Sequence, residues 1–321
     1  MRKGQEHFLQ VLRRLAFATE CSDPRDLVYA FLALQPKIII QSADYSITVE
    51  ETYIRASARL AESSEDLSIF GWVRFDPSSS LPSWVVDWRI QRGTQGSPIA
   101  DTGSRFNACG KYKFKPAQSY QSGSVMKVRG KVVDSIETLA HKDHFQHRDS
   151  TSIVSELQSH KIIGDFDSLC EKVSDTKSNL HQRLIKALFA HSLREDDLDN
   201  WVHKLLAMLA AWQHHVDRDI RIEESLSKEQ RDIIRKLPNH ASLCRSRRLF
   251  VSRDNFSFGL APRDAQPGDL VCILHGSAAP VVLRLIPTGR YLVIGQTYFE
   301  DWMFGKHIYW EEDEADSFEL E

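Results

Sequence analysis

The sequence lacks long hydrophobic runs. No apolar stretch approaches the roughly 20 residues that a transmembrane helix needs, so a membrane-spanning protein is not expected. The N-terminus leads into an amphipathic pattern without the apolar core and small-residue cleavage site of a signal peptide. The 5 cysteines are widely spaced, odd in number and without a C-x-x-C pair, which favours reduced thiols over disulfides or structural zinc. We therefore expect a cytoplasmic protein.

An excess of charge of one sign is also missing. The chain has 41 Lys and Arg residues against 44 Asp and Glu residues, and its net charge is −3. With a hydrophobic fraction of 42%, this balance excludes wholesale disorder and a generally basic nucleic-acid-binding protein. The length of 321 residues suggests about two domains.

No motif typical of catalysis or cofactor binding is present. The sequence contains no G-x-S-x-G, and the glycines of its C-terminal part are too scattered for a phosphate-binding loop. His141, His144 and His147 have a spacing that could place two zinc ligands on one helix face. The third imidazole drifts off that face and the neighbouring residues are charged, so an exposed polar run is favoured. We expect neither a metal nor a cofactor.

Helix signals are concentrated near the N-terminus. Residues 7–17 carry apolar side chains at helical spacing. A second helix is predicted to begin at residues 23–26, where Asp23 suits the N-cap. A third is predicted to begin at Thr48, because Glu51 three residues later completes a capping box.

Strand signals lie in the middle and towards the end of the chain. Residues 67–72 predict a short buried strand, and residues 125–136 alternate like a strand with a bulge or turn at Gly130. Later segments suggest an antiparallel meander or small barrel; they are 249–251, 256–258, 270–274, 281–286 and 291–298. The side chains predicted to point inward are Val271, Ile273, Val281, Leu283 and Leu292.

These signals predict an α+β fold in four parts. Residues 1–140 form an N-terminal α/β part, and residues 141–240 form a helical insertion. Residues 241–310 form a C-terminal β module, and residues 311–321 form an acidic tail that we expect to be frayed.

Several sequence blocks follow one another in a recognisable order. They include DPRDLVYA at 23–30, LPSWVVDW at 81–88, FNACG at 106–110, VRGKVVD at 128–134, RRLFV at 247–251 and PGDLVC at 267–272. Together they resemble the part of fungal heterokaryon-incompatibility (HET) proteins that follows the catalytic region. Full-length members of that family begin with a domain related to TIR-type nucleotide hydrolases, and this chain starts after it. The resemblance thus implies a protein that does not hydrolyse NAD.

One block departs from the family pattern. The family stretch usually reads like G-E-x-Y-V-H-G-x-M-D-G-E, whereas residues 295–306 read GQTYFEDWMFGK. The acidic and histidine positions of the family are here Gln296, Glu300, Phe304 and Lys306. The block is therefore more apolar than the family pattern, with Phe304 at an acidic position of the family.

Aromatic residues gather in two of these blocks, 81–88 and 295–310. One interpretation is ordinary core packing; the other is a pocket for an apolar ligand where the two stretches meet. In the second case Trp84, Trp88, Trp302 and Phe304 shape the pocket. Gln296, Tyr298 and His307 are then the candidate catalytic residues, because each can donate a hydrogen bond to a substrate.

Three classes of function stay open. The first is a small-molecule-binding HET-like protein, such as a cofactor-independent cyclase of fungal secondary metabolism. A cyclase fits because cyclisation of an apolar substrate needs mainly a site that holds the substrate in its reactive conformation. The second is a non-catalytic recognition or regulatory protein with a protein partner. The third is a degenerate gene fragment without function.

Overall fold

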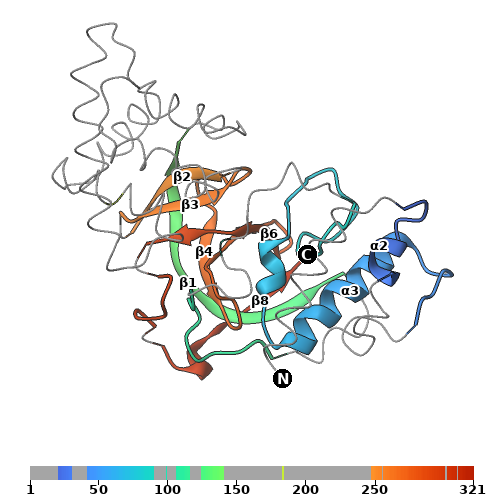
Figure 1. Cartoon of the computed structure of the whole chain (residues 1–321). Helices are drawn as coiled ribbons and strands as arrows, with labels where there is room; N and C mark the ends of the chain where they lie inside the picture. The colour runs from blue at the N-terminus through green and yellow to red at the C-terminus, as the bar shows by residue number, and fades with distance from the viewer. Residues whose placement is uncertain are drawn as a thin grey trace, which may run out of the picture.

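The computed structural model describes residues 21–30, 42–89, 99, 106–115, 124–140, 183, 247–254, 256–300, 302–308 and 310–321. The elements in chain order are α2 (Asp26–Tyr29), α3 (Val49–Ser64), η1 (Ser68–Gly71), β1 (Met126–Leu139), β2 (Arg247–Ser252), β3 (Phe258–Pro262), β4 (Leu270–Leu274), β5 (Val281–Leu285), β6 (Tyr291–Gln296), β7 (Tyr298–Phe299), η4 (Glu312–Glu314) and β8 (Asp316–Leu320). The helix predicted at 7–17 and, apart from Arg183, the predicted helical insertion lie outside the described residues. Figure 1 shows the helices α2 and α3 beside a curved sheet.

The strands form an 8-stranded sheet in the order β4-β5-β6-β8-β1-β2-β3-β7, and β4 also pairs with β1. Strands β4, β5, β6, β8 and β1 are therefore hydrogen-bonded in a closed circuit. All these pairs are antiparallel except β6–β8, which is parallel and has the single register pair Tyr291↔Leu320. The predicted α+β class and the antiparallel C-terminal strands are confirmed. The circuit differs from the prediction because it is closed by β1 and β8, which lie outside the predicted β module of residues 241–310.

Strand β1 belongs both to the closed circuit and to the second half of the sheet, which β2, β3 and β7 form. Its first part pairs with β8 and β4, and its last residues pair with β2 (Figure 1). The irregularity predicted at Gly130 lies elsewhere, because the register against β4 shifts between Val132 and Asp134. Gly130 is instead a site of close approach, where an added Cβ would lie 2.3 Å from the carbonyl oxygen of Ile273.

The acidic tail is not frayed, contrary to the expectation. Its residues Asp316–Leu320 form β8, and Phe318 and Leu320 are buried. The alternate residue Glu319 points to the other face and pairs with Lys127 of β1, with 2.9 Å between Nζ and Oε1. The many acidic residues suggested a solvated tail, but the apolar side chains at every second position are those of a half-buried strand.

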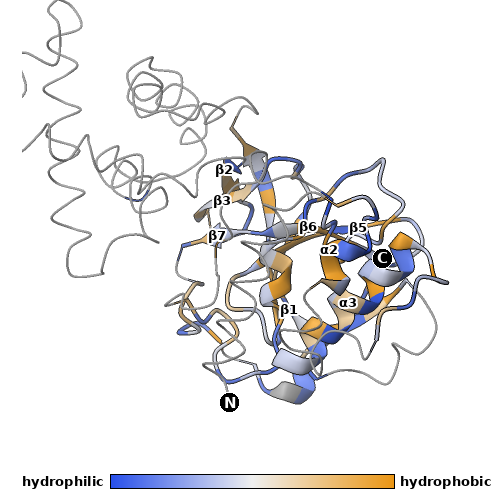
Figure 2. Cartoon of the chain, turned by 45° about the vertical axis from the view of Figure 1, so that its right-hand side comes forward, coloured by the Kyte–Doolittle hydropathy of each residue, from blue (hydrophilic) through white to orange (hydrophobic). Residues whose placement is uncertain are grey.

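Successive side chains of the circuit point to opposite faces and fill two separate cores. The first, called here the helix-side core, packs against α2, α3, η1 and residues 81–88; its circuit residues are Met126, Val128, Cys272, Leu274, Val281, Leu283, Val293, Phe318 and Leu320. The second, called here the aromatic-side core, joins the other face to β2, β3 and residues 299–310; its circuit residues are Ile136, Val271, Ile273, Val282 and Ile294. In both views α2 and α3 lie away from β2 and β3 (Figure 1, Figure 2). The predicted inward residues thus divide between the two cores, and Leu292 is only partly buried.

Local hydrogen bonds lie at the start of both helices, but a side-chain cap is found at α3 alone. The Thr48 side chain accepts a hydrogen bond from the backbone N–H of Glu51 at 3.1 Å, so the predicted N-cap of α3 is confirmed. The Glu51 carboxylate pairs with Arg55, one turn further along. The prediction of Asp23 as the N-cap of α2 is wrong, because α2 begins at Asp26 and its N-cap is Arg25; the Asp23 carboxylate instead accepts from the backbone N–H of Arg25 at 3.0 Å in the preceding turn.

The buried strand predicted at residues 67–72 is wrong. This segment contains the 3₁₀ helix η1, although Leu67, Ile69 and Phe70 are buried as expected. The Asp66 carboxylate accepts from both the backbone N–H and the hydroxyl of Ser68, at 2.9 and 2.6 Å. Such local bonding favours a tight turn, and a short apolar run alone does not distinguish a turn from a strand.

The described helices show no candidate for crossing a lipid bilayer, since none is both long enough and apolar enough.

The two leucines Leu283 and Leu285 of β5 test the packing of the helix-side core. Leu283 is fully buried, whereas Leu285 is 58% exposed. We expect Leu283→Ala to lower the free energy of unfolding by about 2–5 kcal/mol, because it leaves a cavity. Leu285→Ala should change it by less than about 0.5 kcal/mol. Urea denaturation of both variants measures the difference, and equal losses would contradict this arrangement of β5.

Candidate functional site

The structure separates the two aromatic stretches that the sequence suggested as one pocket. Trp84 and Trp88 lie in the helix-side core, whereas Trp302 lies in the aromatic-side core. Gln296 and Tyr298 are buried, and Phe304 and His307 are exposed. The residues predicted to bind ligand therefore pack in different clusters, and each group has its own surroundings.

Ser83 in the block 81–88 joins two strands that barely pair with each other. Its backbone N–H donates to the Glu321 carbonyl oxygen at 3.0 Å, and its hydroxyl donates to the same oxygen. The hydroxyl oxygen accepts from the backbone N–H of Val293 in β6 at 2.8 Å. Ser83 therefore bridges the end of β8 and the middle of β6, where the direct ladder has one register pair.

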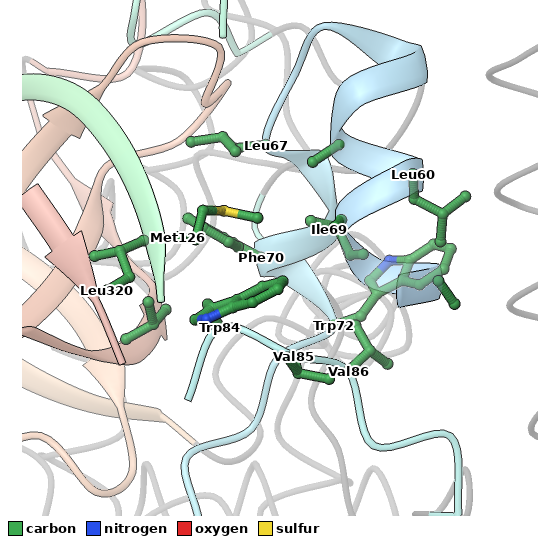
Figure 3. Close-up of a cluster of buried hydrophobic side chains, with 14 of the residues drawn as sticks. Leu60, Leu67, Ile69, Phe70, Trp72, Trp84, Val85, Val86, Met126 and Leu320 are labelled. Carbon is green, nitrogen blue, oxygen red and sulfur yellow. The ribbon is translucent and has the colours of Figure 1, made fainter. Parts of the chain in front are cut away.

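The tryptophans of this block are built into the core. Trp84 is fully buried and its indole N–H donates to the Ser124 carbonyl oxygen at 2.8 Å. It belongs to the cluster that contains Met126 and Leu320 (Figure 3). Trp88 meets Trp72 edge to face, with 5.9 Å between ring centroids. These contacts support the core-packing interpretation for the block, because both rings are packed inside the protein and the Trp84 N–H has its hydrogen-bond partner there.

A stack of aromatic rings runs through the aromatic-side core. The centroid distances are 5.7 Å from Phe250 to Phe299, 6.4 Å from Phe299 to Trp302 and 6.5 Å from Trp302 to Trp310. The planes of neighbouring rings differ by 23°, 3° and 24°. The exposed His307 ring lies 5.7 Å from Trp302, at the outside of this stack. Trp302 is thus a core residue, and His307 is the part of the stack that solvent reaches.

A second aromatic group lies beside the first and is partly open to solvent. Phe106 contacts Tyr298 at 6.2 Å and Phe304 at 5.6 Å between centroids, both edge to face. We call Phe106, Tyr298 and Phe304 the aromatic edge cluster. Phe304 is 36% exposed, and Lys306 Nζ lies 5.7 Å from the centroid of its ring. The cluster therefore combines an accessible apolar ring with a cation.

The turn that carries Phe304 is tied to the FNACG block. The Asn107 backbone N–H donates to the Met303 carbonyl oxygen at 2.9 Å. Gly305 has a φ of 68°, and a Cβ there would lie 2.9 Å from the Asn107 carbonyl oxygen. The two blocks thus pack backbone against backbone, which fixes the position of the exposed side chains.

Glu300 is a residue for which the sequence predicted no role. It is 8% exposed, and its carboxylate accepts from the Phe258 backbone N–H at 3.0 Å and from Arg183 Nε at 2.9 Å. The only signal in the sequence was that Glu300 occupies a position where the chain departs from the HET pattern. Its partner Arg183 is 117 residues away, so spacing could not have revealed the pair.

The two buried cysteines that the structure describes, Cys109 and Cys272, are not activated for nucleophilic chemistry. Burial raises the pKa of the Cys109 thiol, and it does the same for the fully buried Cys272. Both groups therefore stay protonated at neutral pH, and the thiolate is the reactive form. Within the described part of the chain, no cluster of three or more His, Cys, Asp or Glu side chains is placed to hold a metal ion.

The role of Ser83 can be tested against Ser80, an exposed serine of the same loop that has a single side-chain bond to Glu50. We expect Ser83→Ala to lower the free energy of unfolding by about 1–3 kcal/mol, because the Val293 N–H loses its partner. Ser80→Ala should have little effect. Denaturant unfolding of both variants measures this, and a neutral Ser83→Ala would show that the bridge does not close the sheet.

Comparisons with known proteins agree with the sequence blocks. Residues 174–319 match the Het-6 beta-barrel domain. Over 271 residues the chain is 24% identical to heterokaryon incompatibility protein 6, OR allele, of Neurospora crassa. This alignment covers 71% of the chain but 38% of that relative, so the chain spans less than half of it. No solved structure matches. These matches show that the chain is similar to heterokaryon-incompatibility (HET) proteins, in agreement with its sequence blocks.

Proposed function

We propose that this chain is a non-catalytic recognition module related to heterokaryon incompatibility. The observation that carries the proposal is the division of the 295–308 stretch into buried and exposed parts. Gln296 and Tyr298, the first candidates for catalysis, are only 2% and 6% exposed. Among the described residues of this stretch, the exposed ones are Phe304, Lys306 and His307, which lie on one turn.

An exposed turn of this composition suits contact with another protein. Aromatic rings are enriched in the centres of protein interfaces, and a flanking cation adds a directional contact at the rim. The turn is held by the Asn107–Met303 hydrogen bond and by a bond from the Phe299 N–H to Met303 Sδ at 3.4 Å. Such a prearranged surface loses little conformational entropy on binding.

The heterokaryon-incompatibility relative gives the proposal its biological setting. Its name assigns that protein to heterokaryon incompatibility, and the same class of role is proposed here for the chain. To test the proposal, the chain is expressed in one of two otherwise compatible fungal strains, and the viable heterokaryons that the two strains form are counted.

We expect the chain to lower that count, and the double variant Phe304→Ala, His307→Ala to restore it by removing the exposed ring and imidazole. Leu285→Ala, which removes another exposed apolar side chain, is the control and should act like the unaltered chain. The proposal would be contradicted if the chain left the heterokaryon count unchanged in strains of different genotype. It would also be contradicted if the double variant still lowered the count.

A second candidate is the binding of an apolar small molecule, as in a cofactor-independent cyclase of secondary metabolism. The observation that favours it is the aromatic edge cluster, which is open through Phe304 and includes the hydroxyl of Tyr298. His307 beside Trp302 offers another hydrogen-bond donor. In such a site the rings would shape the ligand and the donors would polarise a carbonyl.

Farnesol is a suitable apolar probe for this candidate, and tryptophan fluorescence reports its binding. If the cluster binds apolar ligands, Tyr298→Phe and His307→Ala should weaken binding at least about threefold, roughly 0.6 kcal/mol, without a matching loss of melting temperature. No binding by the unaltered chain, or a large loss of melting temperature with unchanged affinity, favours packing over ligand binding.

A further inference from the structure

We propose that the partner of the exposed turn is an acidic segment of another protein, in which carboxylates flank an apolar side chain. The inference rests on the recognition role proposed above and adds the chemistry of the partner. It is carried by two segments of the chain, residues 106–115 and 302–308. Their exposed rings and lysines, called here the basic-aromatic surface, are Phe304, Lys306, His307, Lys111, Lys113 and Lys115.

The two segments form one surface because their backbones are packed against each other at two glycines. A Cβ added to Gly305 would lie 3.0 Å from the Cα of Gly110, and a Cβ added to Gly110 would lie 3.1 Å from Cδ1 of Ile308. The two segments therefore lie side by side (Figure 1). Lys306 and Lys111 directly follow these glycines, so both cations start from the same small area of backbone.

The surface is positive in a chain whose overall charge is negative. The two segments contain 4 lysines and no Asp or Glu, whereas the whole chain has a net charge of −3. In residues 111–115 exposure alternates, so that Tyr112 and Phe114 are buried and the three lysines between and beside them are exposed. A local excess of positive charge attracts partners of negative charge and orients them during association.

The ion pairs printed on this surface by its own chain are easily replaced. Lys111 Nζ lies 3.8 Å from Glu311 Oε2, and the two side chains are 73% and 77% exposed. Lys113 pairs with Glu65 at 3.0 Å, and these side chains are more than half exposed as well. Ion pairs so open to water are screened and contribute little. A carboxylate of a partner can therefore take the place of Glu311 or Glu65 at small cost.

The exposed ring adds an apolar requirement to the acidic one. Phe304 leans edge to face on Phe106, which leaves part of its ring open to solvent. Lys306 Nζ lies 5.7 Å from the centroid of the Phe304 ring. An apolar side chain that covers Phe304 thereby brings its neighbouring carboxylate next to Lys306. The surface thus fits an acidic segment with an apolar residue better than a purely acidic one.

The acidic residues around the lysines favour a protein partner over a nucleic acid. Glu65 and Glu311 lie next to Lys113 and Lys111, and exposed Asp313 follows Glu311 closely in the chain. Binding of a phosphate backbone relies on an extended basic surface without such interruptions. A short acidic segment can contact the turn and avoid these carboxylates.

The test measures binding of short fluorescent peptides to the full-length chain by fluorescence anisotropy. In the first peptide two leucines are flanked by glutamates. A second peptide has lysines in place of the glutamates, and a third has serines in place of the leucines. We expect the glutamate–leucine peptide to bind at least about tenfold more tightly than either of the others, and its affinity to fall when NaCl is raised from about 50 to about 300 mM.

Variants of the chain place the binding on the proposed surface. We expect Lys306→Gln to weaken binding of the glutamate–leucine peptide about threefold, because it removes one exposed charge contact. Its control is Lys127→Gln, which removes an exposed lysine that pairs with Glu319 in β8. Phe304→Ala should weaken binding at least about threefold, and its control is Leu285→Ala. Both controls should bind like the unaltered chain, and melting temperatures show that each variant is folded.

The proposal is overturned if the glutamate–leucine peptide binds no more tightly than the lysine or the serine peptide, or if Lys306→Gln acts like its control. Tighter binding of a single-stranded oligonucleotide than of this peptide would also overturn it, in favour of a nucleic-acid partner. The heterokaryon test is independent of these measurements. If Phe304 and His307 govern heterokaryon counts but the peptide does not bind, the recognition role stands and the acidic partner is wrong.

Discussion

Both halves of the sheet depend on the close approach of β1 and β4 at Gly130. A side chain at this residue would meet the backbone of Ile273 and Leu274, so only glycine allows the strands to pair at that distance. The same strand continues to β2 and thereby carries the second half of the sheet. A separation of β1 from β4 would open the circuit, expose the helix-side core and remove the support of β2. Two cores thus depend on one contact between backbones.

The circuit is closed by side-chain hydrogen bonds as well as by backbone hydrogen bonds between neighbouring strands. Between β6 and β8 the backbone offers one register pair, and Ser83 adds hydrogen bonds to both the Glu321 carbonyl oxygen and the Val293 N–H. The segment that contains Ser83 also fills the helix-side core with Trp84. A loop block far from both strands in sequence is therefore part of the sheet's closure. This accounts for the Leu-Pro-Ser-Trp sequence by packing and hydrogen bonding, without a ligand.

Local signals in the sequence were sufficient for some elements and not for others. The cap at Thr48 and the strands β4 to β6 could be predicted, because capping, alternation and turn residues act over a few neighbours. Strand β8 was missed because acidic residues hid its alternating pattern, and the circuit was missed because its closure joins Met126 to Leu320. For the candidate site, the sequence located the aromatic positions. Whether a ring lines a pocket or a core depends on contacts between distant segments, which spacing does not encode.

The positions at which this chain departs from the HET pattern now separate by environment. Gln296 and Glu300 are buried, and the backbone oxygen of Gln296 accepts from Arg247 Nη1 at 2.7 Å. Phe304 and Lys306 face solvent on one turn. A change at a buried position must be matched by its neighbours, as Glu300 is matched by Arg183, because an unpaired buried charge is costly. A change at an exposed position meets no such constraint and alters what the surface can bind. The same short stretch therefore holds both a largely buried ion pair and an exposed turn that departs from the HET pattern.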